Sequence, residues 1–208
     1  MIRAGAGAEK NIKSAMGNKT TLVVGICGQP SSGKDTLANY LSEKGFKHFG
    51  TGDILREEMD AMGIATTRSN MRDFVIKRRK ERGAGYLAQI AAKKVTGNSV
   101  ISGLRNTKEV DALKNKFGEN FFLIAVEAPI QLRYEWAKAR GRISDKISFR
   151  QFKAEEDAER RGNPETHEVD NVIKMADYVI NNSGTEAELL VKIDSVIAEL
   201  SSRHKSHA

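Results

Sequence analysis

Short apolar runs alternate with longer segments of helical periodicity along most of this chain. The runs are rich in β-branched and aromatic residues and short enough to be strands; they cover residues 21–27, 46–49, 99–102, 121–126 and 178–180. Between them, apolar positions recur every three or four residues, which predicts helices. A first helix is expected to follow residue 36, and further helices are expected over residues 54–62, 71–82, 86–95, 107–117, 130–139, 149–161 and 186–200. This alternation predicts a three-layer α/β fold, with helices on both faces of a five-stranded parallel sheet.

The two ends of the chain lack such a pattern. Residues 1–19 are rich in Gly, Ala and Lys, and residues 201–208 are polar. We therefore expect a flexible N-terminal extension and a flexible tail around a single domain that spans residues 20–200. A total of 208 residues is enough for one domain with a substantial core.

The turn after the first predicted strand carries the clearest chemistry. From Gly28 to Thr36 it reads Gly-Gln-Pro-Ser-Ser-Gly-Lys-Asp-Thr, and a helical segment follows. A glycine-rich turn between a strand and a helix, with Gly-Lys at its end, is the P-loop arrangement. Backbone N–H groups of such a loop cradle phosphate oxygens, and the helix N-terminus and Lys34 add positive potential. The alternative is a plain glycine-rich turn with an exposed lysine. The motif predicts an ATP-binding loop made of Gly28, Ser31, Ser32, Gly33, Lys34, Asp35 and Thr36.

Charge and cysteine content narrow the class of protein. The formal net charge of +7 fits binding of either polyphosphates or nucleic acid, but the basic residues form no long tract, which disfavours nucleic acid. The densest basic run, residues 77–82, is most simply a solvated helix face, with a phosphate patch or an RNA contact as alternatives. Cys27 has no partner for an intramolecular disulfide, and no apolar run approaches the length of a membrane span. We expect a cytoplasmic protein without a membrane segment.

The end of the loop departs from the usual pattern. Asp35 stands where a Ser or Thr hydroxyl normally binds Mg²⁺, and Thr36 follows it. A Gly-Lys-x-Thr ending resembles that of adenylate kinases and related nucleoside monophosphate kinases. The resemblance implies that Thr36 supplies the hydroxyl for Mg²⁺, while Asp35 either helps to hold the metal or repels phosphate.

A second motif extends this resemblance. Residues 51–56 read Thr-Gly-Asp-Ile-Leu-Arg and follow the second predicted strand. Alone, the Gly-Asp pair could be a turn and a helix cap. Together with the loop, the segment resembles the Thr-Gly-Asp-x-Leu-Arg motif of adenylate kinases. This implies that Thr51 contacts the acceptor base, Arg56 binds the acceptor phosphate and Asp53 lies near the water shell of Mg²⁺. A guanidinium suits the phosphate because it binds two oxygens at once.

A third segment matches the same superfamily with one change. Residues 102–107 read Ser-Gly-Leu-Arg-Asn-Thr and resemble the Asp-Gly-x-x-Arg-Thr segment. The resemblance implies that Arg105 clamps the acceptor phosphate; the alternative is an arginine that faces solvent at a helix start. Ser102 replaces an aspartate that acts through the waters of Mg²⁺, so the metal loses a nearby anion. Either Asp53 or Asp35 compensates, or catalysis is weak.

The same resemblance divides the rest of the chain. It implies an acceptor-binding helical region at about residues 53–96 and a lid at about residues 140–165, which closes over the phosphates. Arg140 and Arg142 are then the arginines that stabilise the transferring group, with Arg133 behind them. We expect the acidic residues 155–157 to form a salt-bridged surface.

These motifs favour a kinase. The chain resembles the P-loop nucleoside monophosphate kinase-like superfamily, and within it an archaeal-type nucleotide-kinase group related to adenylate and dephospho-CoA kinases. The closing residues 176–185 resemble dephospho-CoA kinases, and residues 182–184 are either base-pocket residues or a plain helix cap. The implied activity is transfer of the γ-phosphate of ATP, with Mg²⁺, to a (deoxy)nucleoside monophosphate; the catalytic residues are Lys34, Asp53, Arg140 and Arg142.

Two alternatives stay open. Dephospho-CoA is a second possible acceptor, and because it presents a hydroxyl it requires a base, for which Asp53 is placed. The third possibility is a nucleotide-binding regulatory or RNA-associated protein with weak turnover, motivated by Ser102 and the basic composition. We expect a small-molecule acceptor as the partner, and a monomer or small homo-oligomer.

Overall fold

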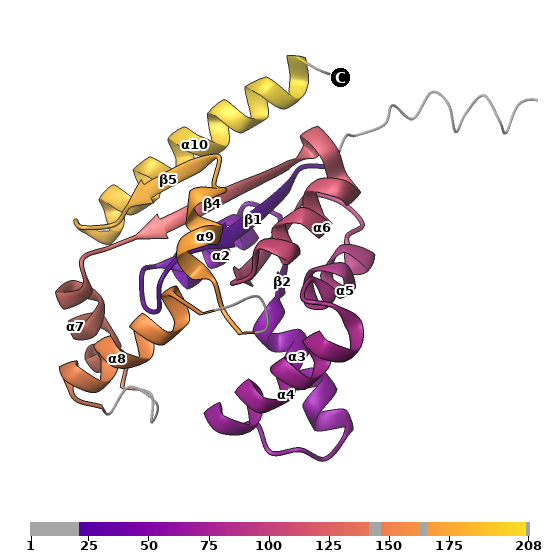
Figure 1. Cartoon of the computed structure of the whole chain (residues 1–208). Helices are drawn as coiled ribbons and strands as arrows, with labels where there is room; N and C mark the ends of the chain where they lie inside the picture. The colour runs from indigo at the N-terminus through magenta and orange to yellow at the C-terminus, as the bar shows by residue number, and fades with distance from the viewer. Residues whose placement is uncertain (1–20, 142–146, 163–165, 207–208) are drawn as a thin grey trace, which may run out of the picture.

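A parallel sheet forms the centre of the molecule. The computed structural model describes residues 21–141, 147–162 and 166–206. Their strands are β1 (Val23–Cys27), β2 (Lys47–Gly50), β3 (Ser99–Leu104), β4 (Phe121–Glu127) and β5 (Tyr178–Asn181). They pair in the order β2-β3-β1-β4-β5, and every pair is parallel (Figure 1). The predicted five-stranded parallel sheet is therefore confirmed.

Helices connect the strands and cover the sheet (Figure 1). The described helices are α2 (Lys34–Glu43), α3 (Thr51–Ala61), α4 (Arg68–Arg82), α5 (Tyr86–Lys94), α6 (Thr107–Phe117), α7 (Ile130–Arg140), α8 (Phe149–Arg160), α9 (Val169–Lys174) and α10 (Glu186–Ser206), with one 3₁₀ turn, η1 (Gly118–Asn120). None of these helices is both long and apolar enough to cross a membrane.

The burial of the strands matches their positions in the sheet. All five residues of β1 are buried, as expected for a central strand that helices cover on both faces. Residues 47 and 48 of β2 are exposed, in keeping with its position at one edge of the sheet. In register, Val23 of β1 lies opposite Ser99 of β3 and Phe121 of β4, so the carboxyl ends of these strands meet at one edge.

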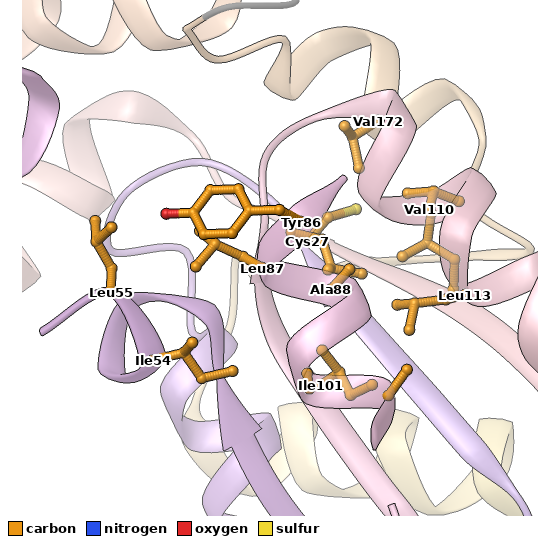
Figure 2. Close-up of a cluster of buried hydrophobic side chains, with 14 of the residues drawn as sticks. Cys27, Ile54, Leu55, Tyr86, Leu87, Ala88, Ile101, Val110, Leu113 and Val172 are labelled. Carbon is orange, nitrogen blue, oxygen red and sulfur yellow. The ribbon is translucent and has the colours of Figure 1, made fainter. Parts of the chain in front are cut away.

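Two apolar clusters form the core, one on each face of the sheet. The first joins the sheet to α3–α6 and α9 and includes Cys27, Tyr86 and Leu87, which Figure 2 shows beside one another. The second joins the sheet to α2 and α10, through residues such as Leu37 and Ile193. Burial raises the pKa of the Cys27 thiol to about 12, so this cysteine is an inert part of the core.

Two elements differ from the sequence expectations. The segment before β5 contains the short helix α9, which the periodicity does not reveal because only six residues form it. Helix α10 continues to Ser206 instead of ending near residue 200. Near this end of the helix, the Ser202 hydroxyl donates to the Glu199 carbonyl at 2.7 Å.

Candidate active site

The loop between β1 and α2 has the backbone shape of a phosphate cradle. Ser31 has φ 58° and Gly33 has φ 101°, left-handed conformations that are typical of loops whose backbone N–H groups form an anion-binding concavity. A Cβ on Gly28 would lie 2.1 Å from the Val126 carbonyl oxygen, so only glycine lets the loop pass this close to β4. In the described part of the chain no side chain caps the start of α2, which leaves its first N–H groups open to an anion.

Contacts from other elements hold this loop in place. The Asn182 side chain, after β5, donates to the Ser32 carbonyl at 3.0 Å. The buried Arg133 of α7 donates to the Pro30 carbonyl at 3.2 Å. Gln29 donates to the Glu127 carboxylate at 3.0 Å. The loop is thus preorganised by residues far away in the sequence.

Lys34 lies within the loop instead of extending into solvent. Its ammonium donates to the Gln29 carbonyl at the start of the loop. Burial, followed by the charge of Arg105, lowers the pKa of Lys34 to about 8. The lysine therefore remains mostly charged at neutral pH. Its charged form is nevertheless less stable than that of a lysine in water, because burial removes much of its solvation.

A cavity of about 380 Å³ opens beside the loop. Its lining comes from the loop, α2, α7 and the β5–α10 region: Ser31, Ser32, Gly33, Lys34, Asp35, Thr36, Asn39, Trp136, Arg140, Asn182, Gly184, Glu186 and Leu189. Arg140 points to the loop, with its Nη2 3.4 Å from the Ser31 hydroxyl. Arg142, its predicted companion, lies outside the described residues. The loop residues and Arg140, separated by about a hundred positions, thus share one cavity.

Mg²⁺ fits the donors at this cavity. Mg²⁺ typically keeps several waters and uses one or two carboxylates together with substrate phosphates. The described residues contain no group of three or more His, Cys, Asp or Glu side chains that could enclose a metal. Asp35 and Thr36 line the cavity at the start of α2. The roles of Thr36, Asp35 and Asp53 as metal donors stay predictions.

The residues expected to bind the acceptor follow β2. The Thr51 hydroxyl is buried and donates to the Gly103 carbonyl at 2.9 Å, which ties the start of α3 to the end of β3. Asp53 and Arg56 form an ion pair on the exposed face of α3. Exposed pairs of this kind contribute at most about 1 kcal/mol, so an incoming phosphate could displace Asp53 from Arg56 at small cost.

Arg105 lies after β3, and carboxylates hold both its side chain and its backbone. Its Nη1 is 3.1 Å from Glu159 of α8. Its backbone N–H donates to Glu109 at 2.8 Å. The other oxygen of Glu109 accepts from Arg79 at 3.3 Å, and both of these side chains are buried. Burial raises the pKa of Glu109, whereas the positive charge of Arg79 favours its ionised form.

Sequence reasoning missed this Arg79–Glu109 pair. Arg79 lies in the basic run 77–82, interpreted as a solvated face, yet only 5% of it is exposed. That interpretation was wrong for Arg79, although Lys80 and Arg82 are exposed. The Asn-x-x-Glu spacing of a capping box at the start of α6, formed by Asn106 and Glu109, was a signal for Glu109 but not for Arg79.

Ser102, which replaces the expected aspartate, has a histidine partner. The Ser102 hydroxyl is 2.7 Å from Nε2 of His48 on the neighbouring strand β2. Burial lowers the pKa of His48, and the nearby charges of Asp53 and Asp35 partly oppose this effect. An uncharged pair therefore occupies the position where the sequence resemblance implies an anion.

For the acidic cluster 155–157, the expected salt bridging is present at Glu156, which pairs with Arg133 and Arg160, but the expected surface position is wrong for this residue. Glu156 is buried instead of lying on the surface, and its carboxylate accepts two hydrogen bonds from Arg133, one of them at 2.8 Å. Arg133 therefore supports the loop through Pro30, and its guanidinium is bound by Glu156 instead of being placed beside Arg140 to stabilise the transferring group. Arg160 is the outer member of this network, 2.8 Å from Asp170 of α9.

Comparison with known proteins shows the family to which the chain belongs. The family model of the AAA domain matches residues 27–161. The UPF0200 protein TK1334 of Thermococcus kodakarensis is 33% identical over 190 residues, which cover 86% of this chain and 100% of that protein. A UPF0200 protein of Thermococcus onnurineus is 30% identical, over 88% of this chain and 100% of that protein. The chain belongs to the UPF0200 family and carries an AAA domain. The expected relationship to an archaeal group of P-loop kinase-like proteins is confirmed.

Solved structures show the same fold. TT1252 from Thermus thermophilus aligns with a TM-score of 0.58 at 20% identity, over 88% of this UPF0200 chain and 99% of that chain. A shikimate kinase from Bacteroides thetaiotaomicron aligns at 0.56 with 12% identity, over 86% and 98%. A gluconokinase from Sinorhizobium meliloti aligns at 0.54 with 14% identity, over 91% and 98%. The UPF0200 protein thus has the P-loop kinase fold.

Proposed function

We propose that this UPF0200 protein is an ATP-dependent phosphotransferase whose acceptor is nucleotide-like, foremost a (deoxy)nucleoside monophosphate. The observation that carries the proposal is the shaped loop, with Lys34 inside it and Arg140 bonded to it at the cavity. Arg56 and Arg105 follow the neighbouring strands, at the edge of the sheet where parallel α/β folds bind ligands. Donor and acceptor phosphates would therefore meet among cations that offset their repulsion.

Positioning and electrostatics supply the catalysis in this mechanism. The loop N–H groups and Lys34 hold the donor phosphates, and Arg140 offsets the charge that develops on the transferring group. Arg56 and Arg105 exchange their carboxylate partners for the acceptor phosphate. When bound, Mg²⁺ would neutralise charge on the donor phosphates, held by Asp35, Thr36 and, through water, Asp53. A monophosphate oxygen is already anionic, so this acceptor requires no base.

A hydroxyl acceptor such as dephospho-CoA is the second candidate, and the His48–Ser102 pair favours it. A hydroxyl must lose its proton during transfer. Asp53 can accept that proton, and the imidazole of His48, whose Nε2 is 2.7 Å from the Ser102 hydroxyl, provides a further acceptor at this edge. Transfer to a hydroxyl therefore requires a proton acceptor beside the acceptor substrate, which transfer to a monophosphate does not.

Phosphate transfer from ATP to a panel of monophosphates and dephospho-CoA tests the proposal, with Lys34→Ala as the inactive control. We expect turnover with one acceptor class and a loss of at least about 100-fold in Lys34→Ala. Asp53→Asn should greatly reduce hydroxyl phosphorylation but reduce monophosphate transfer only mildly. No transfer to any acceptor, together with salt-dependent RNA binding, would instead support the regulatory alternative.

A further inference from the structure

The cavity extends beyond the residues that a triphosphate would contact. Arg140, bonded to Ser31, marks its phosphate end. Trp136 lies one helical turn earlier on α7 and lines the same cavity. Gly184 and Leu189, from the β5–α10 region, contribute to the remaining wall. The site therefore has an aromatic and an apolar wall beside its phosphate-binding loop.

The helix explains why Trp136 is available to a ligand. Residues four positions apart share a helix face, so Trp136 and Arg140 lie on the same side of α7. The buried residues of this helix are Arg133 and Ala137, and Tyr134 packs against Phe149 of α8 with ring centroids 5.3 Å apart. Trp136 instead lies half-buried at the cavity.

We infer that Trp136 stacks on the nucleobase of the phosphate donor, an inference that rests on the proposed function. A nucleobase has flat faces that favour aromatic contact and a polar edge that does not. With the triphosphate on the loop and Arg140 beside it, the base would extend toward the part of the cavity that Trp136 lines. Stacking depends little on base identity, so Trp136 adds affinity for ATP and GTP alike.

The chain provides its own reporter for this contact. Trp136 is the only tryptophan of the sequence, so indole emission of the full-length protein comes from this position alone. ATP and GTP should change that emission at saturation, and tripolyphosphate, which has no base, should change it much less. Calorimetry with the same three ligands then gives the affinities of the wild type and of Trp136→Ala and Trp136→Phe.

We expect Trp136→Ala to lose roughly 5- to 100-fold in affinity for ATP and GTP, with unchanged affinity for tripolyphosphate. Trp136→Phe, which keeps an aromatic face, should recover most of the loss. Equal ATP affinity in wild type and Trp136→Ala would overturn the stacking inference and leave the kinase proposal standing. A parallel loss of ATP and tripolyphosphate would show that Trp136 only supports the fold, and overturn the inference as well. If the wild type binds neither ligand, the proposed function fails and the inference falls with it.

Discussion

Binding of ATP should be coupled to the protonation of Lys34. Burial lowers the pKa of this lysine from its ordinary 10.5 to about 8, which corresponds to about 3 kcal/mol against the charged ammonium. In the free protein this cost is fully present below pH 8 and disappears as the pH rises from about 8 to 10.5, because the unfolded lysine still binds its proton there. Lys34 therefore reduces the stability of the ligand-free protein at neutral pH.

A bound triphosphate reverses this balance, because its negative charge favours the ammonium. If bound phosphate holds the pKa of Lys34 near or above its ordinary value, binding above pH 8 takes up one proton. The affinity should then be nearly constant below pH 7.5 and fall by about 25-fold between pH 7.5 and pH 9.5. A terminal phosphate, with a second pKa near 6, is already ionised across this range and does not contribute.

Calorimetry with magnesium-free ATP in buffers of different ionisation enthalpy measures both quantities, the affinity and the number of protons taken up. Lys34→Arg keeps its charge at all these pH values and should show no such slope. Lys34→Met, with no charge, should bind weakly at every pH. Affinity of the wild type that stays constant from pH 7.5 to 9.5, or an equal slope in Lys34→Met, would refute the coupling.

Two further predictions concern the supports of the site, with the free energy of unfolding as the measurement. Gly28→Ala should cost roughly 2–5 kcal/mol, since its new Cβ would meet the Val126 carbonyl at 2.1 Å. The control Gly45→Ala is also at positive φ but has no heavy atom within 4 Å of the new Cβ, so it should cost only about 1 kcal/mol. Equal costs for the two variants would contradict this view of the loop. Arg79→Met should cost about 3–5 kcal/mol because it leaves the buried Glu109 carboxylate unpaired. Adding Glu109→Gln to Arg79→Met should restore part of that stability, whereas strictly additive losses would argue against a coupled pair.

The elements that could be predicted are those whose signal is local. The segment 107–117 was placed at the bounds of α6 because its apolar periodicity lies entirely within the segment. The strands were found because each is a short apolar run. Helix α9 was missed because it has only six residues, too few to show a periodicity. Its buried Val169 and Val172 are recognisable as core residues only once the packing of α9 against other elements is known.

The same distinction applies to the site. The loop residues form a contiguous motif, so they could be named from the sequence, and all of them except Gly28 line the cavity together. The supports are tertiary: Asn182 reaches Ser32 across 150 positions, and Arg79 reaches Glu109 across 30. A basic run gives no sign of which arginine turns inward, because the exposed and buried members have the same composition.

The acceptor side illustrates what these supports achieve. Arg56 forms an ion pair with Asp53, and Arg105 forms one with Glu159. Both pairs are partly open to solvent. Such pairs are weak, so under the proposed function an acceptor phosphate would take the place of either carboxylate without a large penalty. The backbone of Arg105, by contrast, is fixed by the buried Glu109. The position of this guanidinium is therefore set by the core, while its partner remains exchangeable, and these are the properties that a site needs to bind an anion and release a product of similar charge.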